Sequence, residues 1–240
     1  PAPTKEFTMS EATMPEATMP EANAPEPTLN EMPEADAAKL RELGAKLDQA
    51  NIKRIGSYHF AMAMGALTLW GAAEAWAQVT GWTIAQAAAV ANAVIAATIV
   101  SSIIHEWGHY AGAGMSDSIA PVLNEPKNHF FMFDFKMDQN DIHQFTWMSW
   151  GGILSPWGLV ILTAFFVPLS LTSGAALFAT FVSKAVGASV FEVPIVRSAA
   201  KSGDPSAELT KAVKTGTLGR AGKISKGVGL AVFAVLWLAI

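Results

Sequence analysis

Cysteine is absent from the 240-residue chain, and charged residues make up only 15% of it. Without thiols the chain forms neither disulfides nor thiolate metal sites, so His and carboxylate side chains must hold any metal. Hydrophobic residues account for 51% of the sequence, and no charge occurs between Ala87 and Ile104. This composition is typical of a membrane protein with a polar segment attached.

The N-terminal residues are polar and repetitive. A Glu-Ala-Thr-Met-Pro unit occurs at 11–15 and again at 16–20, and Pro recurs every five residues there. Such a segment cannot bury a core, so we predict that residues 1–36 form a disordered, acidic, Pro-rich tail. Residues 37–57 place leucines at helical spacing among charged residues, which predicts an amphipathic juxtamembrane helix.

Long apolar runs predict the membrane-spanning part of the chain. We expect spans near residues 58–79, 83–114, 145–171 and 174–201, with a last apolar run at 227–240 that is short for a full crossing. The polar residues 115–145 predict a small β-like loop at the membrane surface. The fold class is therefore an all-α polytopic membrane protein with four to five transmembrane helices.

Lys and Arg residues fall on one side of these spans. The turns near residues 81 and 173 contain none, whereas the N-terminal segment, the 115–145 loop and the 202–226 segment contain most of them. The positive-inside rule places these three segments, and hence the N-terminus, in the cytoplasm. We expect an integral, multi-pass protein of the bacterial inner membrane.

A His-Glu-x-x-His pattern ends the uncharged run, with His105, Glu106 and His109 as its ionisable members. Two imidazoles four residues apart lie on one face of a helix, so both can bind one metal ion, and Glu106 can reach a metal-bound water. Ionisable groups inside a membrane span are costly and are candidates for function. The pattern favours a catalytic Zn²⁺ site with one open position.

A catalytic zinc site needs a third protein ligand, and depth in the membrane favours Glu192. His105 and Glu192 each lie nine residues before the expected cytoplasmic end of their span, about 13 Å deep. Asp204 is the alternative ligand, although Asp-Pro also predicts the N-cap of a helix there. His129 and His143, in or beside the cytoplasmic loop, are further alternatives.

Two more charges lie within the predicted spans. Glu74 is the only charge of the first span, and Lys184 lies in the fourth. A mutual ion pair would lower the cost of burying both, so we hypothesise that they pair and join these spans.

These residues together resemble the site-2 protease family of intramembrane zinc metalloproteases, over roughly residues 83–204. The pattern at 105–109 matches the family's metal-binding motif, and residues 151–155 match its Gly-x-x-x-Asn/Ser/Gly motif on the next span. The stretch 191–194 lies where the family has Asn-x-x-Pro, followed by an Asp that is the third zinc ligand. Here no Leu-Asp-Gly occurs, and the expected Asp position falls near Ala199.

The resemblance implies a peptidase that hydrolyses membrane-spanning substrates near the cytoplasmic face. It implies Glu106 as catalytic base and Gly151, Gly152 and Ser155 as substrate-binding residues. Residues 58–204 would form the metalloprotease-like core, and 205–240 a basic cytoplasmic segment with a final apolar helix. Expected partners are a membrane protein substrate, the lipid bilayer and a membrane complex, but no nucleic acid. The alternative is a non-catalytic, metalloprotease-like subunit of a larger complex.

Overall fold

The structure is a computed structural model that describes residues 34–239. The chain divides into two units, residues 1–44 and 45–240. The tail predicted to be disordered, residues 1–36, lies outside the described residues except for its last three, which begin helix α1 (Glu34–Thr80). Within the first unit, the described residues are all helical.

Helix α1 differs from the two elements predicted for this part of the chain. The predicted amphipathic helix at 37–57 and the predicted span at 58–79 are both segments of α1. Lys53 and Arg54, next to the predicted junction, do not interrupt the helix, because charged residues with good helix propensity can continue it. The helix ends at Thr80 and is followed by Gly81, whose φ of 66° is readily adopted only without a Cβ atom.

Four helices among the described residues are long and apolar enough to cross a membrane. They are α2 (Thr83–Met115), α3 (Ile142–Phe166), α4 (Thr172–Ser202) and α6 (Thr217–Ala239). Residues 58–79 are not among them. The apolar run at 227–240, short for a full crossing by itself, belongs to α6, which already begins at Thr217. Gly216, with a φ of 71°, separates it from the short helix α5 (Pro205–Lys214).

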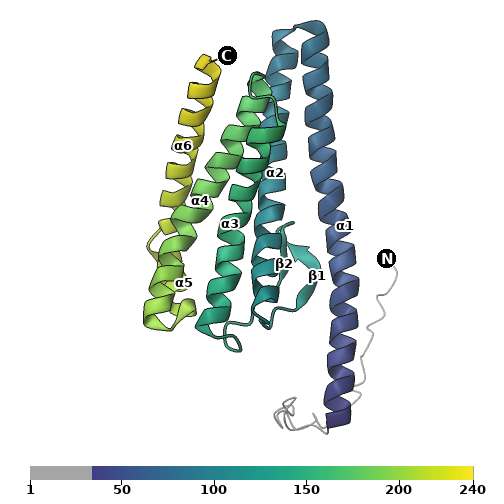
Figure 1. The fold of residues 1–240 in the computed structure, drawn as a ribbon, viewed down its shortest axis with the longest axis vertical. Helices are drawn as coiled ribbons and strands as arrows, with labels where there is room; N and C mark the ends of the chain where they lie inside the picture. Colours follow the sequence, from purple (N-terminus) through teal and green to yellow (C-terminus); the bar gives the residue numbers. More distant parts are fainter. Residues whose placement is uncertain (1–33, 240) are drawn as a thin grey trace, which may run out of the picture. The chain divides into compact units, whose positions relative to one another are not determined.

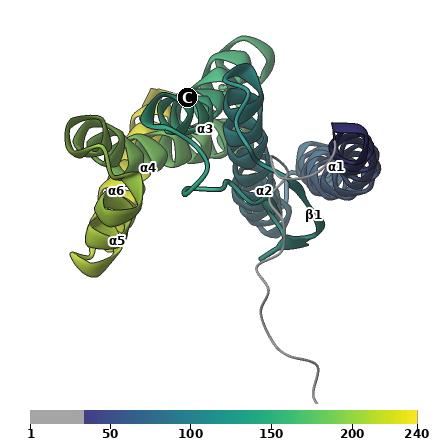
Figure 2. The same cartoon turned by 90° about the horizontal axis from the view of Figure 1, so that it is seen from below.

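Helices α2, α3 and α4 pack against one another, and α6 covers the outer side of α4. Figure 2 shows this arrangement along the helix axes. Small residues on α2 make the close packing possible, because apolar lipid gives helices little hydrophobic reason to associate and backbone proximity supplies the contacts instead. The fully buried alanines of α2 are Ala85, Ala89, Ala93, Ala96, Ala97 and Ala113.

A small antiparallel hairpin follows α2, as predicted for the 115–145 loop. It consists of β1 (Val122–Lys127) and β2 (Phe131–Phe133), with Val122 opposite Phe133. Met132 of the hairpin is fully buried against Ile55 of α1. Helix α3 then begins with a capping box, in which Asp141 and Gln144 bond each other's backbone N–H groups.

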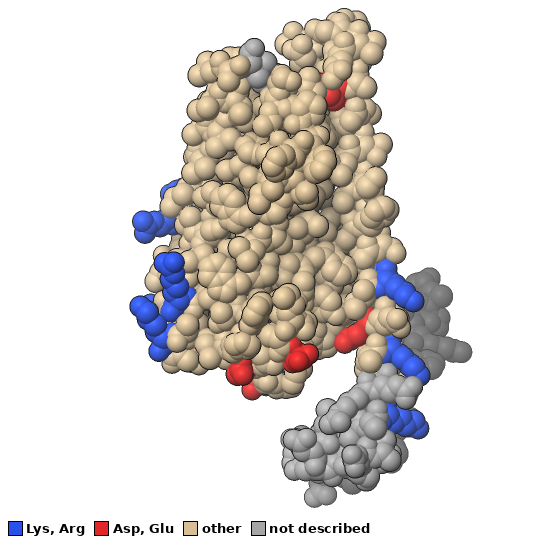
Figure 3. All heavy atoms as spheres, in the orientation of Figure 1, with Lys and Arg blue, Asp and Glu red and all other residues tan. Residues whose placement is uncertain are grey.

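Charge is distributed unevenly over the surface. On the face shown in Figure 3, Lys and Arg side chains gather towards the end of the molecule that carries the hairpin and α5. The wide band between that end and the α1–α2 turn is almost free of charge. Such a band suits contact with hydrocarbon, and it fits the four helices of spanning length.

Candidate metal centre

Helix α2 places two imidazoles side by side. His105 and His109 are one turn apart, with ring centroids 4.5 Å apart and Nε2 atoms 3.1 Å apart. Their side chains are 21% and 14% exposed. Glu106 lies between them in sequence and is buried. The His-Glu-x-x-His residues are therefore all on a helix, inside the group of apolar helices.

Backbone carbonyls of α3 orient both rings. His105 Nδ1 lies 2.9 Å from the Gly152 carbonyl oxygen, and His109 Nδ1 lies 3.0 Å from that of Met148. A carbonyl oxygen only accepts hydrogen bonds, so each Nδ1 carries the proton and donates it. Both Nε2 atoms then present lone pairs, which is the tautomer that binds metals through Nε2.

Pro156 explains why one of these carbonyls is available. In a helix the carbonyl of residue 152 would accept from the N–H of residue 156, but proline has no N–H. The Gly152 oxygen accepts instead from His105 Nδ1 and, at 3.2 Å, from Ser155 Oγ. Pro156 was not among the residues assigned to the site from sequence, yet its position four residues after Gly152 is visible there.

Helix α4 brings a carboxylate to the two Nε2 atoms. Glu192 Oε1 lies 3.0 Å from His105 Nε2, and Oε2 lies 3.6 Å from His109 Nε2. One ligand atom from each residue lies within 4.8 Å of the others. The Oε2 atom is buried and accepts no hydrogen bond within the described part of the chain.

This donor set fits a cation. The two Nε2 atoms and the Glu192 carboxylate converge, while both Nδ1 atoms face backbone carbonyls of α3. Ligands of tetrahedral zinc, at about 2.0–2.1 Å from the ion, lie about 3.3 Å from one another. The two Nε2 atoms are 3.1 Å apart and His105 Nε2 lies 3.0 Å from Glu192 Oε1, and both distances are close to this value. His105, His109 and Glu192 are therefore the residues that would hold a metal ion.

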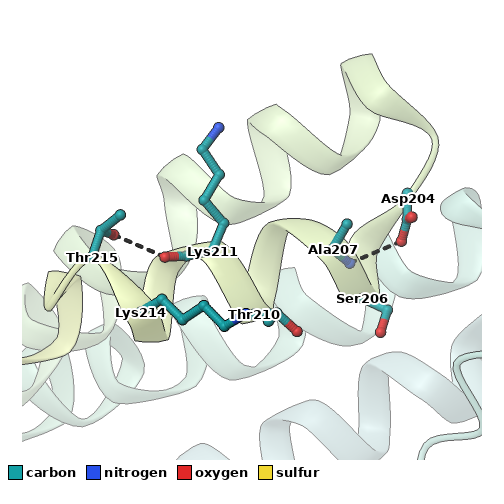
Figure 4. Close-up of a pocket in the computed structure, with 7 residues that line it drawn as sticks. All are labelled: Asp204, Ser206, Ala207, Thr210, Lys211, Lys214 and Thr215. Carbon is teal, nitrogen blue, oxygen red and sulfur yellow. Dashed lines mark hydrogen bonds between the residues drawn. The ribbon is translucent and has the colours of Figure 1, made fainter.

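The alternative ligands lie elsewhere. Asp204 is the exposed N-cap of α5, where its Oδ1 accepts the Ala207 N–H at 2.9 Å, as Figure 4 shows. It faces a shallow hollow along α5 and does not join the histidines. His143 accepts from Trp147 Nε1 at 2.9 Å, and His129 lies 3.2 Å from the Tyr58 hydroxyl.

Glycines allow α2 and α3 to approach closely enough for these contacts. A Cβ atom at Gly152 would overlap the His109 ring, and one at Gly151 would overlap the backbone of Gly108. Gly151, Gly152 and Ser155 were expected to bind substrate, but they lie at this helix contact, outside the lining of the cavity. In the structure they pack α3 against α2, and Gly152 contacts both histidines; substrate binding by these residues stays a prediction.

A cavity of about 770 Å³ opens beside the three ligands. Its walls come from α2, β2, α3, α4, α5 and α6 and include Glu106 together with His105, His109 and Glu192. Aromatic residues of the hairpin segment line one side, at positions 130, 131, 133 and 135. The candidate metal centre is thus accessible to a largely apolar ligand of considerable size.

The hypothesis of a Glu74–Lys184 ion pair is wrong. Glu74 accepts hydrogen bonds from the Ser173 hydroxyl and, at 3.0 Å, from Gln78. Ser173 lies eleven residues before Lys184 on α4, about 16 Å along the axis. The depth in the membrane estimated from the sequence was too imprecise to show this axial distance between Glu74 and Lys184. Lys184 instead lines the cavity.

Comparison of the chain with protein-family models, with curated proteins and with solved structures finds no match. The function of the chain is therefore inferred from its own residues and geometry.

Proposed function

We propose that the protein is an intramembrane zinc metallopeptidase that hydrolyses peptide bonds of membrane-spanning substrates near the cytoplasmic face. The observation that carries the proposal is the convergence of His105, His109 and Glu192 beside Glu106, in a cavity among helices of membrane-spanning length. The resemblance of the 105–109 pattern to site-2 proteases supports it. The distribution of Lys and Arg supports a cytoplasmic position for the hairpin and α5.

Glu106 is the residue we assign to proton transfer. It is buried and lines the cavity beside both histidines. When bound, zinc supplies Lewis acidity and activates water as a nucleophile near neutral pH. As the water oxygen attacks the peptide carbonyl carbon, Glu106 accepts a water proton and then donates it to the nitrogen of the breaking C–N bond. The products are a carboxylate end and an amine end.

The hairpin offers one edge for holding an unwound substrate. The outer edge of β1 is already engaged, because Val122 N–H donates to Asp48 Oδ1 at 3.0 Å and Val122 O accepts from Asn51 Nδ2 at 3.1 Å. Phe131 and Phe133 of β2 line the cavity instead. We therefore assign strand addition by the substrate to β2, next to the candidate metal centre.

Zinc content and cleavage of a membrane-anchored reporter test the proposal together. The wild-type chain should hold one zinc and cleave the reporter. Glu106→Gln should keep the zinc and abolish cleavage, whereas Glu192→Ala should lose both. Asp204→Ala is the matched control and should keep both, because Asp204 only caps α5.

Cleavage by Glu106→Gln at the wild-type rate would rule out the assigned base. Zinc bound by the wild-type chain without cleavage of any reporter would favour the non-catalytic subunit over the enzyme.

A further inference from the structure

Lys184 is a charged residue of the cavity that the proposed mechanism does not use. It is partly buried on α4 and is the only Lys or Arg among the residues that line the cavity. Among the described residues it makes no hydrogen bond or ion pair. A cation in this position is costly in an apolar setting unless an anion accompanies it.

Lys184 and the metal ligand Glu192 occupy the same stripe of α4. They are eight residues apart and both line the cavity, as do Gly187, Ala188 and Phe191 between them. Eight residues correspond to about 12 Å along a helix. The small side chain of Ala188 leaves room for a bound chain between the ammonium group and the candidate metal centre.

The cavity contains no carboxylate that could serve Lys184 without leaving the metal site. Among the described residues, Glu106 and Glu192 are its only acidic lining residues; Glu192 is a candidate ligand and Glu106 lies beside the ligands. Glu74, the acid expected to pair with Lys184, is held by Ser173 and Gln78. An anion for Lys184 therefore has to arrive with the ligand that fills the cavity.

We propose that Lys184 is a specificity-determining residue that binds the carboxylate of an Asp or Glu in the substrate, an inference that rests on the proposed peptidase function. Lys184 lies farther from the hairpin end of α4 than Glu192, so the acid lies on the membrane-interior side of the cleaved bond. An extended peptide covers 12 Å in about four residues. The recognised acid is thus about four residues from that bond.

Binding of synthetic membrane-spanning peptides tests this inference without requiring turnover. The probe is a series of fluorescent Leu/Ala peptides with one Asp at successive positions, matched to a series with Asn. The full chain is used in detergent micelles, zinc-loaded and carrying Glu106→Gln to prevent cleavage. We expect Asp to bind about tenfold more tightly than Asn over a window of one or two positions, as a charge-assisted hydrogen bond would allow.

Variants assign the preference to Lys184. In the same background, Lys184→Gln should remove the preference for Asp, Lys184→Arg should retain it, and Lys184→Glu should prefer peptides with Lys in the same window. Lys201→Gln is the matched control, because Lys201 is exposed in the last turn of α4 and should change nothing.

Equal binding of Asp and Asn peptides at every position would overturn the inference, and that comparison needs no variant at residue 184. Persistence of the Asp preference in a folded Lys184→Gln chain would overturn it as well. Failure of the proposed function looks different: the Asp preference would be present and Lys184-dependent, but the chain with native Glu106 would cleave no peptide. Cleavage without any acid preference would retain the peptidase and remove the inference.

Discussion

Glu192 and Asp204 are the two carboxylates near the end of α4, and their surroundings are opposite. Asp204 is exposed, and its oxygen accepts the Ala207 N–H at the start of α5. Glu192 is 14% exposed, and its Oε2 accepts no hydrogen bond among the described residues while two imidazoles face it. A carboxylate satisfied by a helix N-terminus needs no further partner, whereas a buried one facing two imidazoles is suited to share a cation with them.

The largest difference in zinc affinity should appear when Glu192 and Asp204 are each replaced by the corresponding amide. Glu192→Gln removes the ligand charge, so zinc affinity should fall more than the 10- to 100-fold typical of changes in outer-shell partners. Asp204→Asn should leave zinc affinity unchanged, because Asn also caps helices well. Competition with a zinc chelator measures both. Equal losses for the two variants would erase the distinction drawn between these residues.

Gly152→Ala tests whether the surroundings of Glu192 depend on close helix contact. The added methyl group would overlap the His109 ring. We expect zinc affinity to fall about 10- to 100-fold because the ring must move away from Glu192. Gly158→Ala on the same helix is the control, since nothing lies within 4 Å of its added Cβ. Chelator competition again gives the affinities, and wild-type zinc binding by Gly152→Ala would contradict the packing argument.

Pro156→Ala should have a smaller effect. It restores the backbone N–H that can compete with His105 Nδ1 for the Gly152 carbonyl. We expect zinc affinity to fall severalfold, towards the lower end of outer-shell effects, while the thermal stability of α3 rises. Isothermal titration with zinc and a melting curve measure the two changes. A rise in zinc affinity would indicate that the free carbonyl does not orient His105.

Asp134 is a third carboxylate that can be compared with Glu192 and Asp204. Its side chain is exposed to solvent and lies beside a lysine. A hydrogen bond from Lys136 at 2.6 Å holds the pKa of the Asp134 carboxyl below its usual value. The pair therefore stabilises the fold above the unfolded-state pKa of about 3.9, and this contribution is lost as the pH falls through the folded-state pKa.

Asp134→Asn should remove that small contribution and flatten the pH dependence of unfolding between about pH 5 and pH 3. Exposed ion pairs contribute little, so this effect is the smallest of the four. Denaturant unfolding at several pH values measures it. Any change in zinc content would show that the hairpin is coupled to the metal centre.

Periodicity and charge were sufficient to predict α2, α3 and α4 as long apolar helices, the hairpin, and α2 and α4 as the helices that carry the candidate metal ligands, but not the extent of α6 or the absence of residues 58–79 from the helices of spanning length. The depth argument named Glu192 because helix rise is nearly constant, and the structure brings this residue to His105 and His109. Metal binding itself stays a prediction. The sequence also predicted the cap at Asp204, because Asp-Pro is a local signal that needs no tertiary information.

Tertiary relations were not predictable in the same way. The pairing of Glu74 with Ser173 depends on the axial offset between α1 and α4, which hydropathy does not define. The orientation of Lys184 into the cavity depends on the rotation of α4 about its axis. The link from Pro156 to His105 passes through a backbone carbonyl of a different helix, so no spacing rule along one segment reveals it.

Because main-chain oxygens of α3 orient both imidazoles, the acceptors beside the two rings are insensitive to side-chain substitution. No side-chain replacement at Met148 deletes the acceptor beside His109, since every residue carries the same carbonyl. The orientation of both imidazole rings therefore depends on how α3 packs against α2. A small tilt or slide of α3 would shift both carbonyl acceptors together. Lipid thickness and neighbouring proteins affect helix tilt. Through that tilt they would affect the basicity of the Nε2 atoms of both histidines.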